Sequence, residues 1–360
     1  MLRAIVTSPL NILLLAAPAS WIAEVTAPGS PWVFIAAAAS LVPLASLIGQ
    51  GTEQLAARSG PALGGFLNAT FGNAAELIIA LVALRNGHVA LVKASISGSI
   101  IGNLLLVLGL SFFVGGLGRR SQKFHRTPAT NAAAMLFLAV VALVMPAVFD
   151  LAIYGTLDVH PRAIDSLSFW TALVLMSAYA GNLIYAFTAQ RDLLRPGGES
   201  AHGVTTLSVA ASVGLLAIGT VLTTVQAEIL VGAMTPALKR FALTELFVGV
   251  VVVALIGNAA EHYSAVTAAR RDEMSLAVEI SVGSSTQIAL FVAPALVLYS
   301  FAIGRPMTLL FNPFEITAIA LSVLATAFVV VDGESNWVEG VQLLSVYLIL
   351  ALAFYFVPGG

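Results

Sequence analysis

Apolar stretches long enough to cross a bilayer follow one another along almost the whole of this 360-residue chain. A membrane-spanning helix needs about 20 mostly apolar residues. Backbone polar groups inside a bilayer must bond internally, which restricts spanning segments to helices or closed barrels, and runs of this length indicate helices. Eleven spans are therefore expected, near residues 8–26, 31–54, 61–85, 88–116, 128–150, 165–188, 204–232, 242–270, 274–301, 307–331 and 337–357.

The composition agrees with a protein that lies mostly inside a membrane. Apolar residues make up 59% of the chain and charged residues 9%, which excludes an ordinary soluble domain. Lys and Arg fall in short clusters between the apolar runs, so no basic face indicates nucleic-acid binding. Cysteine is absent, which excludes a disulfide framework and a thiolate metal site. We expect an all-α polytopic membrane protein whose surroundings are the lipid bilayer.

The pentapeptide Gly-Asn-Ala-Ala-Glu occurs twice, at Gly72–Glu76 and Gly257–Glu261. A Gly-Ser pair follows each copy at the same distance, at Gly98–Ser99 and Gly283–Ser284. The shared register indicates an internal duplication. An ionisable residue within a membrane span is a candidate functional site, and two acids related by a repeat suggest a cation held between them.

The charges of the connecting loops predict how the chain crosses the membrane, because cytoplasmic loops are richer in Lys and Arg. In the eleven-helix arrangement one side carries Arg3, Arg58, Arg119, Arg120, Lys123, Arg126, Arg191, Arg195, Arg270 and Arg271. The other side carries Arg85, Arg162, Lys239, Arg240 and Arg305. The N-terminus is therefore expected in the cytoplasm and the C-terminus outside.

The same helix count divides the chain into a leading helix and two repeats. We expect a leading transmembrane helix at residues 1–27, a five-helix repeat at 28–190, a cytoplasmic linker at 191–203 and a second five-helix repeat at 204–360. An odd number of spans per repeat inverts the second copy, an architecture typical of alternating-access transporters. The first run also resembles a secretory signal, but it is long for one, so a retained helix is expected.

Each copy of the pentapeptide places an amide and a carboxylate on one helix face. Asn73 and Glu76 are three residues apart, as are Asn258 and Glu261. Two such faces meeting inside the membrane would form an all-oxygen cage with two negative charges. Ca²⁺ takes about 6–8 hard oxygen ligands, whereas Zn and Cu prefer ligand types that are scarce here. Mn²⁺ and Na⁺ also suit oxygen sites.

The empty cage suggests protons as the counter-substrate. Two carboxylates that share a low-dielectric cavity repel each other and are poorly solvated, and both effects favour the protonated form. The pair should take up protons when the cation leaves, and it should titrate as a pair. Ca²⁺ and H⁺ are therefore expected as transported substrates, with no cofactor.

The segments GNAAELIIALVALRNGHVALVKASISGSIIGNLLLVLG and GNAAEHYSAVTAARRDEMSLAVEISVGSSTQIALFVAPAL closely resemble the two signature repeats of the cation/proton exchangers, the calcium/proton antiporters. GTEQLA (Gly51–Ala56) and QAEILVGA (Gln226–Ala233) are similar to that family's second and seventh helices, so the resemblance covers nearly the whole chain. It implies a membrane antiporter that exports Ca²⁺ in exchange for H⁺, expected in a prokaryotic plasma membrane, and not an enzyme.

The resemblance also implies roles for individual residues. Glu76 and Glu261 would be the central cation and proton carboxylates, and both would hold the metal. The remaining members of the implied site are Asn73, Asn258, Ser99, Asn103, Ser284 and Gln287. The asparagines could instead hydrogen-bond neighbouring helices, and the serines could only permit close helix packing.

Four further ionisable residues are candidates for a proton path or for gating. His262 could tune Glu261, relay a proton, or simply pack. Glu279 could be an entry-path acid, a second proton site or a membrane-surface carboxylate. Glu53 and Glu228 lie near helix ends, where entry, gating and plain solvation are all compatible with the sequence.

Two other functions fit parts of the sequence. A sodium/calcium exchanger, or an exchanger of another divalent cation, would use the same fold and would differ in the driving ion. An intramembrane metal-dependent enzyme would also bury acids, but the sequence lacks the His/Asp-rich motif or nucleophile dyad that it would need. A non-transporting scaffold leaves the duplicated acids unexplained.

Overall fold

The computed structural model describes residues 9–59, 64, 67–68, 70–155, 161–189 and 207–358. The described part is helical apart from turns, loops and two strands of two residues each. The chain divides into two compact units. Unit 1 comprises Met1–Val82 and Ser177–Phe241, and unit 2 comprises Ala83–Met176 and Ala242–Gly360.

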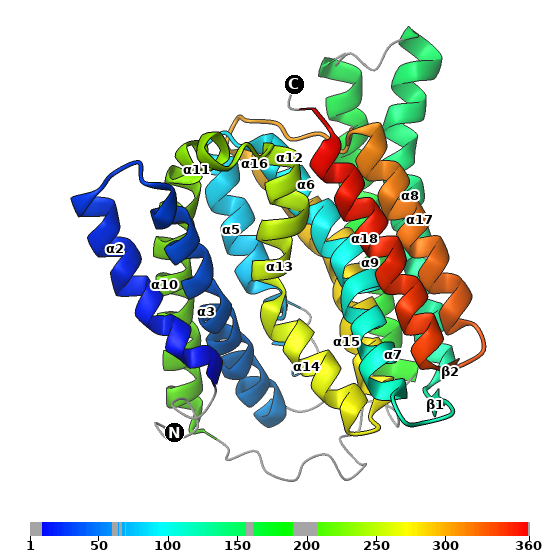
Figure 1. The fold of residues 1–360 in the computed structure, drawn as a ribbon. Coiled ribbons are helices and arrows are strands. Elements are labelled where there is room, and N and C mark those ends of the chain that lie inside the picture. The colour runs from blue at the N-terminus through cyan, green and yellow to red at the C-terminus, as the bar shows by residue number, and fades with distance from the viewer. Residues whose placement is uncertain are drawn as a thin grey trace. The chain divides into compact units, whose positions relative to one another are not determined.

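Unit 1 is built around one long helix, α3, which packs against α2 and α10 (Figure 1). Gly51 of α3 faces the backbone of Leu216 in α10, a close approach that a residue without a side chain permits. The hydroxyl of Ser20 donates to Oε1 of buried Gln226 at 2.9 Å. Its described elements are η1 (Pro9–Leu15), α2 (Ala16–Thr26), α3 (Pro31–Arg58), most of α5 (Ala74–Arg85), the end of α9 (Pro161–Ala189), α10 (Val209–Gly232) and α11 (Met234–Phe241).

Unit 2 contains three long helical rods that each include a π-helical segment. The first rod is α6 (Val89–Ile101), η2 (Gly102–Val107) and α7 (Leu108–Gly116). The second is α12 (Glu245–Phe247), η3 (Val248–Val253), α13 (Ala254–Gly257) and α14 (Ala259–Arg270). The third is α15 (Met274–Gln287), η4 (Ile288–Val292) and α16 (Ala293–Ala302). A π-turn widens a helix locally and is frequent at functional sites.

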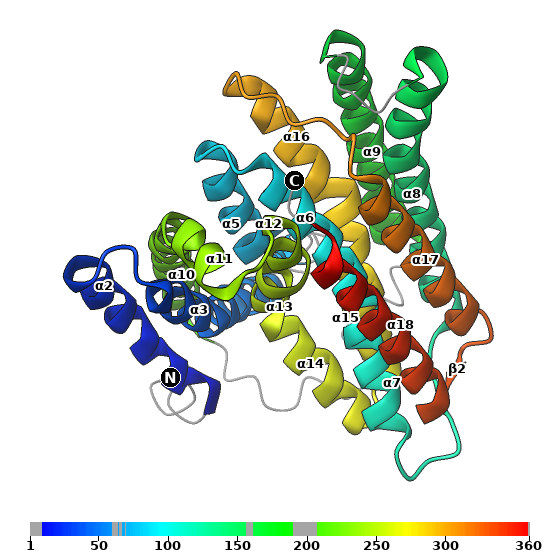
Figure 2. The same cartoon turned by 45° about the horizontal axis from the view of Figure 1, so that its top comes forward.

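The remaining helices of unit 2 surround these rods. They are α8 (Arg126–Tyr154), the first part of α9, α17 (Pro313–Val330) and α18 (Trp337–Phe356). Figure 2 shows α18 alongside α7, and the two helices pack closely. Strands β1 (Gln122–Lys123) and β2 (Glu334–Ser335) pair antiparallel and join the loop after α7 to the loop before α18.

Glycines let α6 approach η3 until their backbones touch. A methyl group on Gly98 would collide with the carbonyl of Val250, and one on Gly249 would meet the side chain of Ala94. Helices in membranes associate through such small residues, because lipid supplies no hydrophobic force between them. Close contact between α6 and η3 therefore depends on these two glycines.

Eight helices of the described residues are long and apolar enough to cross a membrane, or nine if Met234–Phe241 and Glu245–Gly257 form one bent span. Eight of the predicted spans coincide with them, within about six residues at each end. The run near 8–26 forms a shorter apolar helix, Asn11–Thr26. The predicted helix near 61–85 lies partly, and the linker 191–203 wholly, outside the described residues. The count of eleven stays a prediction.

Replacing Gly98 with Ala should destabilise unit 2 by about 1–3 kcal/mol, the usual cost of overpacking. The repeat partner Gly283 is the matched control, because nothing lies within 4 Å of a methyl group built there. Ala at position 283 should be neutral or stabilising by about 1 kcal/mol, since Ala favours a helix over Gly. Thermal unfolding of the purified variants measures both. Equal effects of the two substitutions would contradict the close packing.

Candidate functional site

Asn258 occupies a break between two helices. α13 ends at Gly257 and α14 begins at Ala259, and Asn258 between them has φ −92° and ψ 7°. Its N–H donates to the carbonyl of Ala254 at 3.1 Å, and its own carbonyl accepts from the N–H of His262 at 3.0 Å. Helical hydrogen bonds thus continue across one irregular residue, whose side chain is buried.

The Asn258 side chain joins two rods of unit 2. Its Nδ2 donates to Oγ of Ser99 at 2.9 Å and to the carbonyl of Ala254 at 2.8 Å. Its Oδ1 accepts from Nδ2 of Asn103 at 3.0 Å. Asn103 and Asn258 are each 1% exposed. Three of the predicted site residues therefore form one buried hydrogen-bonded group.

Glu261 lies in the first turn of α14 and belongs to the same cluster. Its Oε1 accepts from Oγ of Ser284 at 2.9 Å, and the side chain of Asn103 also interacts with the carboxylate. Within the described part of the chain, no Lys, Arg or His forms an ion pair with Glu261. Its second oxygen, Oε2, is buried with no hydrogen-bond partner among the described residues, and so is Oδ1 of Asn103.

These two oxygens set the chemistry of the cluster. Buried polar atoms in proteins are nearly always satisfied, so an exception calls for an explanation. Both are acceptors that lack a donor, a condition that a cation or a proton can satisfy. Carboxylate, amide and hydroxyl oxygens are also the ligand types that hard cations such as Ca²⁺ prefer. The unit 2 cluster can therefore supply oxygen ligands to a cation.

The first copy of the pentapeptide has similar local structure. Asn73 immediately precedes α5, and its carbonyl accepts from the N–H of Leu77 at 3.1 Å. Asn73 is 2% exposed, and Glu76 lies in the first turn of α5. Both residues belong to unit 1, whereas Glu261 belongs to unit 2. The pairing of Glu76 with Glu261 stays a prediction.

The other predicted residues are spread over several helices. His262 lines a small crevice with Asn258, Gly98 and Gly102. Gln287 is the last residue of α15, directly before η4. The side chains of three other candidates are exposed: Glu279 on α15, Glu53 on α3 and Glu228 on α10. Roles of these residues in a path or a gate stay predictions.

Sequence reasoning missed two features that position the cluster. Asn103 and Asn258 are 155 residues apart, and no spacing predicts their hydrogen bond. The only signal was that both amides lie in otherwise apolar spans. Two further anchors of α6 were also missed: Ser97 donates to Glu315 at 2.9 Å, and Lys93 donates to the carbonyl of Leu310 at 2.8 Å. Those bonds fix the helix that carries Ser99.

Asn103→Ala and Asn258→Ala should each destabilise unit 2 by about 1–3 kcal/mol, because each leaves the partner amide buried and unpaired. The double variant should lose less than the sum, with a coupling of about 0.5–3 kcal/mol. Unfolding in increasing concentrations of a denaturing detergent measures the stability of the wild type, both single variants and the double variant. Additive losses would show that the two side chains do not interact.

Comparison with known proteins places the chain among membrane transporters. The model of the sodium/calcium exchanger protein family matches residues 29–188 and 211–356. The chain is 41% identical to the Ca²⁺/H⁺ antiporter of Synechocystis sp., over 96% of this chain and 97% of that protein. It is 40% identical to the Ca²⁺/H⁺ antiporter ChaA of Bacillus subtilis, over 88% of this chain and 90% of that protein.

Solved structures show the same likeness. The structure of native YfkE matches with a TM-score of 0.83 and 36% identity, over 97% of this chain and all of that one. The H⁺/Ca²⁺ exchanger CAX matches with a TM-score of 0.72 at 15% identity, over 96% of this chain and 91% of that chain, which shows a shared fold. The relatives of this chain are named as transporters and antiporters, and not as enzymes. The chain is an integral membrane protein that belongs to the sodium/calcium exchanger protein family.

Proposed function

We propose that this chain is a secondary antiporter that exports Ca²⁺ from the cytoplasm in exchange for H⁺. Two relatives that match most of the chain, from Synechocystis and from Bacillus, are named Ca²⁺/H⁺ antiporters, and this supports the proposal. The observation that carries the proposal is the buried cluster around Glu261, where a carboxylate that has no basic partner among the described residues lies against amide and hydroxyl groups. A site of this kind can hold a cation in one state and a proton in another.

The cation would be held by both copies of the duplicated motif. Glu261 and Asn103 each offer a buried oxygen that has no donor in the described part of the chain, and Glu76 with Asn73 would complete the ligands from the first copy. Two carboxylates balance one divalent charge. When Ca²⁺ leaves, each carboxylate loses its counter-charge in a low-dielectric setting, and protonation restores neutrality. Alternating access to this site would couple the two fluxes.

The proposed architecture has a leading helix and two inverted five-helix repeats, with the N-terminus in the cytoplasm. It rests on the duplicated motif and on the charges of the loops. Ser121 lies in the exposed loop between α7 and β1, which would be cytoplasmic. A cysteine introduced there should resist an impermeant maleimide in intact cells and react after lysis. Labelling in intact cells would reverse the orientation.

Sodium-driven calcium exchange is the second candidate, favoured by the description of the matching family. The two candidates differ in the ion that drives uptake. Radioactive calcium uptake into proteoliposomes, under an imposed pH gradient or an imposed Na⁺ gradient, separates them. Uptake with the pH gradient alone supports the proposal, and uptake that requires Na⁺ overturns it.

Neutralising either Glu76 or Glu261 to Gln should reduce calcium exchange at least about tenfold, because an interaction with a charged group is worth about 1.5–3 kcal/mol. Gln preserves the shape of the side chain, so insertion into the membrane should be unchanged. Glu334→Gln is the control, since Glu334 pairs with exposed Lys123 on β1. Near-normal exchange by either site variant would exclude a two-carboxylate site.

Calcium and protons should compete for the site. Apparent calcium affinity should fall as the pH drops, because protonated carboxylates cannot bind the cation. Calcium binding to detergent-solubilised protein should release protons into weakly buffered solution, which a pH indicator records. Glu261→Gln should diminish that release, whereas His262→Gln should leave much of the calcium affinity intact. Binding without proton release between about pH 5 and 8 would contradict shared occupancy.

A further inference from the structure

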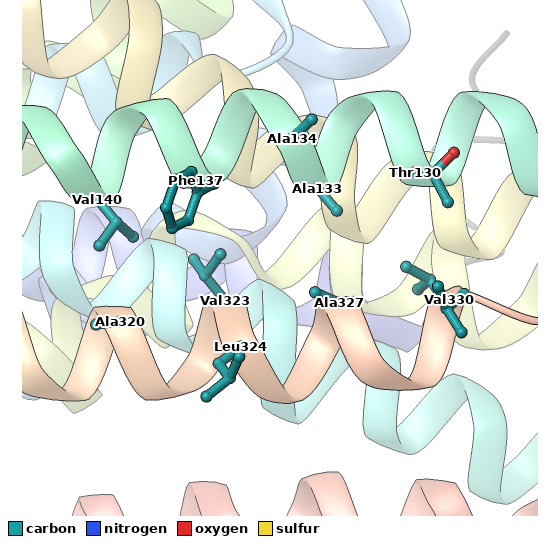
Figure 3. A pocket seen from close by; sticks show the side chains of 11 residues that line it. Thr130, Ala133, Ala134, Phe137, Val140, Ala320, Val323, Leu324, Ala327 and Val330 are labelled. Carbon is teal, nitrogen blue, oxygen red and sulfur yellow. The ribbon is translucent and has the colours of Figure 1, made fainter.

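An apolar groove of about 590 Å³ runs along unit 2 between α8 and α17 (Figure 3). Apart from Thr130 its lining is apolar, and it includes Ala133 and Ala134 on α8 and Ala320 and Ala327 on α17. The hydroxyl of Thr130 donates back to the carbonyl of Arg126 at 3.0 Å. The lining therefore presents hydrocarbon along its whole length.

The length of the groove matches one leaflet of a bilayer. α8 has 29 residues, which corresponds to about 43 Å of helix and to about 40–45 Å of bilayer with its headgroups. The groove extends along α8 from Thr130 to Val140, about 15 Å, or half of the roughly 30 Å hydrocarbon core. Its Thr130 end therefore lies near the headgroups, and its Val140 end lies near the midplane.

A basic residue stands at the headgroup end. Arg126 precedes Thr130 by one helical turn and lies on the same face of α8. It is exposed and forms no ion pair among the described residues. Gly333 lies against Arg126. Of the two acids beside Gly333, Glu334 pairs with Lys123 at 3.6 Å and Asp332 accepts from the N–H of Glu334 at 3.1 Å, so neither forms an ion pair with Arg126. The guanidinium is thus available to an anion from the membrane.

We propose that this groove binds one phospholipid, with an acyl chain along α8 and α17 and the phosphate against Arg126. Guanidinium groups bind phosphate oxygens in a bidentate geometry. Figure 3 shows Phe137 of α8 directed toward Val323 of α17, and both side chains line the groove. A hydrocarbon chain suits this apolar lining, and the phosphate supplies the counter-charge that Arg126 lacks among the described residues.

Native mass spectrometry of the purified protein in detergent tests the proposal. The probes are phosphatidylglycerol and a diacylglycerol with the same chains but no phosphate. Ala133→Trp and Ala327→Trp fill the groove, and Val148→Trp, at a position on α8 outside the groove that is 47% exposed, is their control. Arg126→Gln removes the charge, and Arg162→Gln, at the start of α9, is its control. Thermal unfolding confirms that each variant is folded.

The wild type should bind one phosphatidylglycerol about tenfold more tightly than the diacylglycerol, as expected for one charged hydrogen-bonded contact. Arg126→Gln should abolish that preference, and the groove-filling variants should weaken the binding of both lipids about tenfold. Both control variants should behave as the wild type does. Unchanged binding after filling the groove would overturn the proposal. A change in oligomeric state without a change in lipid binding would identify the groove as a contact between copies, which also overturns it.

Discussion

The hydrogen bonds of Asn258 are the interaction on which the rest of unit 2 depends. A bilayer offers no water to polar groups, so a buried amide must find its partners inside the protein. Asn258 finds them on α6 and η2, at Ser99 and Asn103. These bonds require the two rods to lie very close together, which Gly98 and Gly249 permit. The hydrogen bonds of the Asn258 amide therefore depend on the small size of Gly98 and Gly249.

The same cluster shows how a membrane protein can hold a site that is polar but incomplete. The side-chain amides of Asn103 and Asn258 and the hydroxyl of Ser284 all donate hydrogen bonds within the cluster. The acceptors outnumber them, and the excess falls on Oε2 of Glu261 and Oδ1 of Asn103. An excess of donors would suit an anion, whereas an excess of oxygen acceptors suits a cation or a proton. The balance of donors and acceptors thus selects the sign of the ligand.

The sequence predicted the helices well because an apolar run in a membrane has few alternatives. Spans such as 88–116 and 274–301 agree with the structure to within a residue or two at each end. The polar residues of the cluster were also predicted, since Asn258 and Glu261 are out of place in an apolar helix. What could not be predicted was geometry. No distinctive residue composition marks the π-helical segments. The hydrogen bond between Asn103 and Asn258 depends on how two helices that are far apart in the sequence cross.

The two copies of the motif share their acids but differ in the amides around them. In the register of the duplication, Ile288 corresponds to Asn103, and Gly102 corresponds to Gln287. In an inverted repeat, the two access states exchange the conformations of the copies. Identical carboxylates would keep the charge of the proposed site the same in both states. Different amides would give each state its own hydrogen bonds, so the two states would differ in energy. With the proposed inverted repeats, the duplication would preserve the ion chemistry, and the substitutions between its copies would set the balance between inward and outward access.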